Sequence, residues 1–197
     1  LRMLNGSHSF LAYLGYLAGF AHINDCMHDE AFREAARRLM LDEQAPTLRI
    51  TGVDLTAYAD SLLERFANPA LKHRTWQIAM DGSQKLPQRI LDSVRVHLQR
   101  ESRWPLLALG IAGWMRYVSG VDDAGQPIDI RDPLADKIHA IVETSNETER
   151  VASLLALKEI FGNDLPLNPL FVDAVGDAWQ SIAAHGAHGA VKRVLSA

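Results

Sequence analysis

The sequence predicts an all-α fold, a multi-helical single domain built from 197 residues. Apolar residues recur at spacings of three and four along most of the chain, which is the period of an amphipathic helix. Helix start signals, with Asp or Asn before a proline or an apolar run, punctuate the second half. Only residues 47–51 alternate as a strand would, between Pro46 and Gly52. No fixed repeat or low-complexity tract divides the chain, so one domain is expected.

Three helices are expected in the first half. Residues 10–21 form an uncharged apolar run, too short for the ~20 residues that cross a bilayer, and predict a buried helix. Asp54 is the expected N-cap of an amphipathic helix that ends before Asn68. Residues 86–101 predict another amphipathic helix, started by Leu86-Pro87, with a solvated polar face that includes Arg89.

The second half predicts four more helices. Residues 105–118 are apolar nearly all round, which is typical of a central buried helix. The next helix is expected to start at Asp132-Pro133, with the carboxylate as its cap. Asn146 and Glu149 resemble a capping box for a single helix ending at Gly162. The last helix begins at Asn168-Pro169 and ends at His185-Gly186, and residues 119–131 are the longest expected irregular connection.

Composition excludes several classes of protein. The formal charge of −4 and pI of about 6.1 argue against a nucleic-acid partner, whose binding needs excess Lys and Arg. The single cysteine, Cys26, cannot form an internal disulfide, which favours a cytoplasmic location. No membrane segment or signal peptide is recognised. The chain opens with Leu1 inside a continuing pattern, so it is expected to be a piece of a longer protein.

The first candidate site is formed by Asn5 and His8, just before the first apolar run. Their spacing of three places both side chains on one face near a helix N-terminus, where amide groups and the helix dipole favour developing negative charge. That environment suits a carbonyl oxygen that becomes an alkoxide. The alternative is structural, because Asn is a good N-cap and a histidine in a first turn is often only partly buried.

The second candidate site is a cluster of polar residues around an Asp81-Gly82-Ser83 turn. The turn is expected to present Lys85 just before the next helix. Lys85, with His73, Arg74 and Gln77, would bind a carboxylate or several hydroxyls. The alternative is that these residues are solvated helix ends.

A metal site is not expected. His22, Asp25, Cys26 and His28 cluster in sequence, but their spacing matches neither a zincin motif nor zinc knuckles. Cys26 has no base in the pattern to activate it and is expected to be a small buried side chain. No Gly-rich dinucleotide motif or phosphate-binding loop occurs, so no cofactor-binding fold is expected within this chain.

Three separated motifs give the sequence a family resemblance. Residues 1–9 read LRMLNGSHS, residues 65–69 read RFANP, and residues 81–87 read DGSQKLP. Together with residues 117–120 and 131–133, they resemble the mannitol dehydrogenase family of polyol-specific long-chain dehydrogenases. The resemblance covers nearly the whole chain and corresponds to the helical C-terminal domain of that family.

The resemblance implies a metal-independent, NAD-dependent dehydrogenase. Asn5 and His8 fit a Lys-x4-Asn-x2-His motif whose lysine, the general base, falls one position before Leu1. Asn5 would stabilise the oxyanion together with an asparagine from an N-terminal dinucleotide-binding domain outside this chain, and His8 would orient the substrate. NAD would be held mainly by that domain, so the chain alone is expected to be inactive.

The resemblance also bears on the substrate. Lys85 matches a substrate-binding basic position, whereas Gln77 stands where mannitol-type members have an Arg. His73 and Arg74 are candidates for binding a sugar-acid carboxylate. The expected substrate is therefore a small sugar acid or polyol that is interconverted with its keto form, with D-mannonate and D-fructuronate preferred. The alternatives are mannitol or another alditol, and, from a different class, a non-catalytic helical interaction or dimerisation module.

Overall fold

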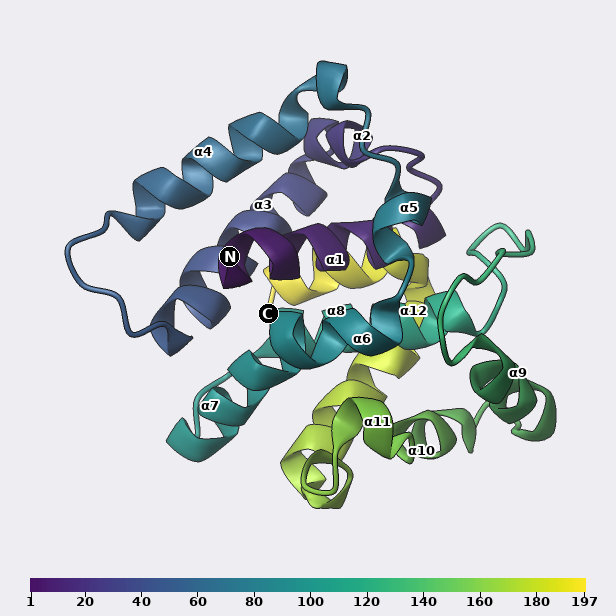
Figure 1. Ribbon diagram of the computed structural model, residues 1–197. Coiled ribbons are helices and arrows are strands. Elements are labelled where there is room, and N and C mark those ends of the chain that lie inside the picture. Colours follow the sequence, from purple (N-terminus) through teal and green to yellow (C-terminus); the bar gives the residue numbers. More distant parts are fainter.

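The computed structural model describes residues 1–197 and is helical throughout, with no β-strand (Figure 1). The first half contains α1 (Arg2–Leu17), α2 (Ile23–His28), α3 (Glu30–Arg38), α4 (Leu55–Ala67), α5 (Thr75–Ala79), α6 (Gly82–Leu86) and α7 (Asp92–Arg100). The second half contains α8 (Pro105–Val118), α9 (Ala135–Thr144), α10 (Arg150–Leu155), α11 (Lys158–Phe161) and α12 (Pro169–Leu195). Short 3-10 turns lie at Ala45–Thr47, Pro69–Leu71 and Leu165–Leu167. The fold class is confirmed as all-α.

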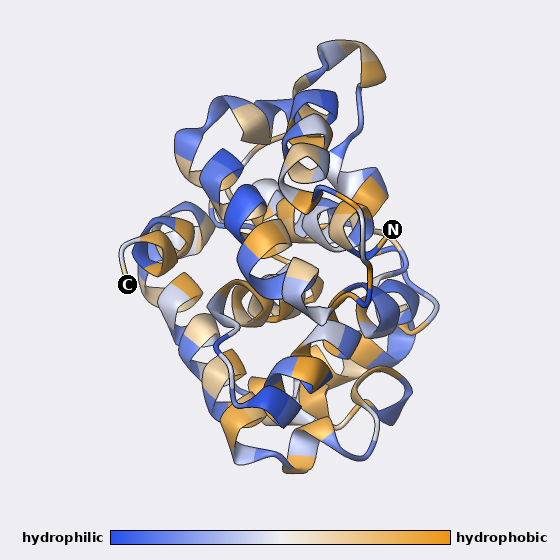
Figure 2. Ribbon diagram, turned by 90° about the vertical axis from the view of Figure 1, so that its left-hand side faces the viewer, coloured by the Kyte–Doolittle hydropathy of each residue, from blue (hydrophilic) through white to orange (hydrophobic).

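Helices α1 and α8 form the centre of the molecule, and α12 packs along α8 (Figure 1). The apolar run at 10–21 lies in α1 up to Leu17 and is almost completely buried, and α8 is buried along nearly all of its length, both as predicted. A single cluster of 50 buried apolar residues connects all parts of the chain, which makes it one domain. Most helices carry both hydrophobic and hydrophilic residues (Figure 2), as expected of helices with one buried face. No helix has the length and hydropathy needed to span a membrane.

The predicted helix caps are confirmed where the signal is local. The Asp54 carboxylate accepts a hydrogen bond from the backbone N–H of Ala57 at 3.0 Å. The Asn168 side chain accepts from the N–H of Leu170 at 3.0 Å. Asn146 and Glu149 form both bonds of a capping box, at 3.0 and 3.4 Å. These side chains satisfy backbone donors that the first turn of a helix leaves free.

Three helix predictions are wrong in extent. The helix expected from Asn146 to Gly162 is broken after Leu155, and its second part is α11. α9 begins at Ala135 and not at Pro133, since residues 133–134 form a turn in which the Asp132 carboxylate accepts from the N–H of Leu134 at 2.8 Å. The last helix does break at Gly186, whose φ of 68° is left-handed, but the chain resumes a helix to Leu195.

The segment 86–101 also differs from the prediction. The helix starts at Gly82 and passes through Pro87 without interruption, so Lys85 lies inside a helix and not in the preceding turn. Residues Pro87–Leu91 form a π-helical turn, η4, between α6 and α7. A second π-helical turn, η1 (Leu39–Gln44), follows α3. Residues 47–51, the only strand candidate, form a 3-10 turn end followed by irregular chain.

Candidate substrate site

The N-terminal half of α1 is held by a buried glutamine from η1. Gln44 is fully buried, and its Nε2 donates to the carbonyl oxygen of Arg2 at 3.1 Å and to that of Arg89 at 3.4 Å. Gly6 makes room for this bridge, since a Cβ at that position would overlap Gln44 Nε2 and lie 2.7 Å from the Arg89 oxygen. The bridge fixes the first turn of α1, which carries Asn5, against η4.

His8 lies in a half-buried, cationic environment. Its ring stacks on Phe66 of α4 with centroids 5.0 Å apart, and it meets His73 edge-on at 5.4 Å. Burial, followed by the positive charges of His73 and Arg89, lowers the pKa of His8 to about 4. Its Nε2 atom is buried and has no hydrogen-bond partner. His8 is therefore a neutral imidazole at neutral pH, and the hydrogen-bonding capacity of its Nε2 is unused within this chain.

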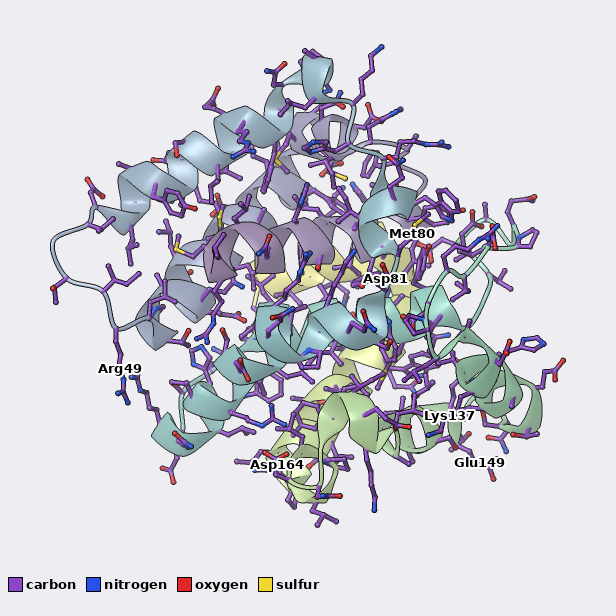
Figure 3. The ribbon with its side chains drawn as sticks, in the orientation of Figure 1. Arg49, Met80, Asp81, Lys137, Glu149 and Asp164 are labelled. Atoms are coloured by element: carbon purple, nitrogen blue, oxygen red, sulfur yellow. The ribbon has the colours of Figure 1, made fainter.

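Backbone hydrogen bonds fix both ends of the segment that carries the second candidate cluster, residues 73–85. At one end, the N–H of Ile23 donates to the carbonyl of His73 at 2.9 Å, and the N–H of Thr75 donates to Ala21 at 3.0 Å. At the other end, the N–H of Asp81 donates to the carbonyl of Arg131 at 2.9 Å. Figure 3 shows Asp81, beside Met80, at the junction between α5 and α6. The fold thus fixes residues 73–85 beside α1 through partners distant in sequence.

The structure separates the predicted residues of this cluster. His73 lies against His8, and Lys85 is half-buried with its Nζ donating to the carbonyl of Ile78 at 3.0 Å. Gln77 and Arg74 are exposed, and the Arg74 guanidinium lies 5.8 Å from the Trp76 ring centroid. Of the four predicted residues, His73 and Lys85 are therefore the two that lie toward Asn5 and His8.

Sequence reasoning missed Arg89. Its expected place on a solvated helix face is wrong, because the side chain is half-buried and its Nη1 donates to Ser9 Oγ at 3.1 Å. Ser9 lies four residues after Asn5 on α1, so the two share a face of that helix. The available signal was the four-residue spacing between Lys85 and Arg89, which places both cations on one side of their helix.

The remaining polar cluster, around Cys26, caps a helix and packs in the core. His22 and Asp25 form a capping box at the start of α2. Cys26 is buried, and burial raises the pKa of its thiol well above the usual range. No group of three or more His, Cys, Asp or Glu side chains is placed to hold a metal ion.

Comparison with known proteins decides the family. Residues 1–183 match the family described as mannitol dehydrogenase C-terminal domain. The chain belongs to this family. The mannitol dehydrogenase resemblance of the separated motifs and the helical fold of the chain agree with that assignment.

Relatives in the mannitol dehydrogenase family match nearly the whole chain. It is 70% identical to the protein named Uncharacterized oxidoreductase YeiQ of Escherichia coli (strain K12), over 99% of this chain and 40% of that protein. It is 57% identical to D-mannonate oxidoreductase of the same organism, over 97% of this chain and 40% of that protein. The chain thus spans about two fifths of the length of these relatives.

A solved structure of the mannitol dehydrogenase family has the same fold. Pseudomonas fluorescens mannitol 2-dehydrogenase, in a ternary complex with NAD and D-mannitol, superposes with a TM-score of 0.92 at 33% identity. The match covers 98% of this chain and 39% of that protein. The helical arrangement around α1 and α8 is therefore a family architecture.

Proposed function

We propose that this chain is the substrate-binding half of an NAD-dependent oxidoreductase that interconverts a sugar acid or polyol with its keto form. The 57% identity to D-mannonate oxidoreductase favours D-mannonate and D-fructuronate as the substrate pair. Mannitol 2-dehydrogenase, a structural neighbour at 33% identity, makes mannitol the second candidate. The observation that carries the proposal is the neutral His8 with its unpartnered Nε2, beside Asn5 and surrounded by cations.

The proposed roles follow from chemistry and position. Oxidation of an alcohol carbon removes a hydride and the hydroxyl proton, and NAD, when bound, supplies the hydride acceptor. The upstream lysine expected from the resemblance takes the proton. The Asn5 amide, in the first turns of α1, donates to the substrate oxygen as it gains negative charge. His8 binds the same oxygen or a neighbouring hydroxyl through Nε2, and its neutrality avoids an additional buried positive charge.

The site is only partly covered in this chain, where Asn5 and His8 are half-buried. Neither Asn5 nor His8 lines any of five surface cavities of about 240–570 Å³. One of these, of about 510 Å³, is lined by residues that include Leu98, Trp104 and Leu170 and lies away from α1. We propose that a dinucleotide-binding domain, in the part of the protein that this chain does not span, closes the site over Asn5 and His8. Closure excludes water and brings the cofactor to the substrate.

The test is kinetic and uses the full-length enzyme that carries this domain. Asn5→Ala and His8→Ala are expected to lower kcat for the preferred substrate by roughly 100-fold or more, because each removes a donor to the reacting oxygen. His139→Ala is the matched control, since His139 is exposed on α9. Thermal unfolding of each variant separates loss of chemistry from loss of fold. Unchanged turnover in folded Asn5→Ala and His8→Ala would contradict the proposal. A comparison of kcat/KM for D-mannonate, D-altronate and D-mannitol with the wild-type enzyme ranks the candidate substrates.

A further inference from the structure

Two cations face the candidate site from one helix. Lys85 in α6 and Arg89 in η4 are four residues apart, and both are half-buried. Lys85 donates to a backbone carbonyl, that of Ile78, and Arg89 donates to the hydroxyl of Ser9. Neither side chain forms an ion pair within this chain, whereas Arg95, on α7 just beyond η4, pairs with Asp164 at 2.7 Å. Partly buried charges are normally paired, so this pair of cations is complementary to an anion.

Titratable groups on several elements act on this pair, including Tyr13 of α1 on Arg89. Burial lowers the pKa of both cations, and the nearby Arg89 lowers that of Lys85 further. The carboxylates of Asp81 and Asp132 act on Lys85 in the opposite direction, but Asp132 is already bonded to Ser83. Two cations that repel each other at a half-buried position leave a region of positive potential.

This positive region adjoins the reacting centre. His8 and Ser9 lie on either side of Asn5 on α1, at spacings of three and four residues from it. The Arg89 guanidinium is fixed on Ser9 and also contributes to the positive field at His8. A substrate oxygen held by Asn5 and His8 would therefore lie on the side of α1 that Arg89 contacts through Ser9.

We propose that Arg89, assisted by Lys85, binds the carboxylate of the substrate and makes the site selective for sugar acids over neutral polyols. The inference rests on the proposed function. A guanidinium is a planar fork that matches a carboxylate with two parallel hydrogen bonds. Arg89 uses one N–H on Ser9, which orients the fork, and its other donors remain for the ligand.

The experiment compares Arg89→Gln with wild type in the full-length enzyme, with D-mannonate and D-mannitol as substrates and NAD as cofactor. Loss of a charge-assisted pair is expected to raise KM for D-mannonate roughly 10- to 100-fold and to change KM for D-mannitol less than about threefold, within the context dependence of a neutral hydrogen bond. Where only one compound is oxidised, competitive inhibition by the other gives its binding constant.

Two further variants keep the test decisive. Arg95→Gln is the matched control, because Arg95 pairs with Asp164 and is expected to leave the ratio of the two KM values unchanged. Arg89→Lys retains the charge without the planar fork and is used if Arg89→Gln does not fold. It is expected to raise KM for D-mannonate severalfold and to leave that for D-mannitol unchanged.

The outcomes separate the two proposals. Equal changes in both KM values, or no change in either, in folded Arg89 variants would overturn the assignment of Arg89. A wild-type enzyme that oxidises and binds neither compound would instead overturn the proposed function.

Discussion

The close approach of Gln44 to the backbone at Gly6 yields a quantitative prediction for Gly6→Ala. The new methyl group would overlap Gln44 Nε2 and approach the Arg89 carbonyl to 2.7 Å. Gln44 must move and lose its two backbone hydrogen bonds, at about 1 kcal/mol each. Overpacking adds about 1–3 kcal/mol, and the better helix propensity of Ala returns about 1 kcal/mol. The free energy of unfolding is expected to fall by about 2–4 kcal/mol.

Urea unfolding of the 197-residue chain measures this change. Gly176→Ala is the matched control, because Gly176 is also inside a helix, α12, and a Cβ there meets no atom within 4 Å. The control is expected to stabilise the chain by about 0.5–1 kcal/mol through helix propensity, so the two substitutions have opposite signs. Gly6→Ala with wild-type or greater stability would refute the close contact of Gln44 with α1.

Two further predictions concern titration. The Glu43 carboxylate is buried and accepts from the N–H groups of Leu106 and Leu107, yet burial raises its pKa to about 7 from an ordinary 4.5. Between these values the folded state holds a proton that the unfolded state has released, so stability falls as pH rises from 4.5 to 7, by about 3 kcal/mol. Glu43→Gln is expected to lack this component, and parallel pH profiles of unfolding for the two proteins would contradict it. His8 is expected to titrate by NMR at about pH 4, and a normal value near 6.5 would show that it is not buried among cations.

Sequence predicted those parts of the fold that depend on neighbouring residues. The caps at Asp54 and Asn168 and the limits of α8 involve contacts within a few residues, and these were found correctly. The predicted start of α9 is two residues too early, and the bonds of Asp132 to Ser83, 49 residues away, could not be predicted from local sequence. The passage of a helix through Pro87 was also missed, since it depends on a π turn packed against α1.

The candidate site also combines features that local sequence predicts with features that depend on contacts distant in sequence. The spacing of Asn5 and His8 leaves a structural role open, and the family resemblance is what predicts them as site residues. The structure adds the neutral state of His8, which arises from its burial and from residues far along the chain. Arg89 was assigned to a solvated face, because helical periodicity alone does not show that a second helix covers that face. Only the packing of α1 on η4 reveals its bond to Ser9.

The two π-helical turns each take up one residue more than an α turn does. Because the extra residue is taken up within the π turn itself, deleting one residue from Pro87–Leu91 would leave an ordinary α turn, with α7 in nearly the same rotation about the axis relative to α6. Buried Ser93 and His97 would keep facing the core. A deletion inside α7 has no such extra residue and would rotate the segments on its two sides by ~100° relative to each other. Single-residue deletions should therefore be tolerated better in η4 than in α7.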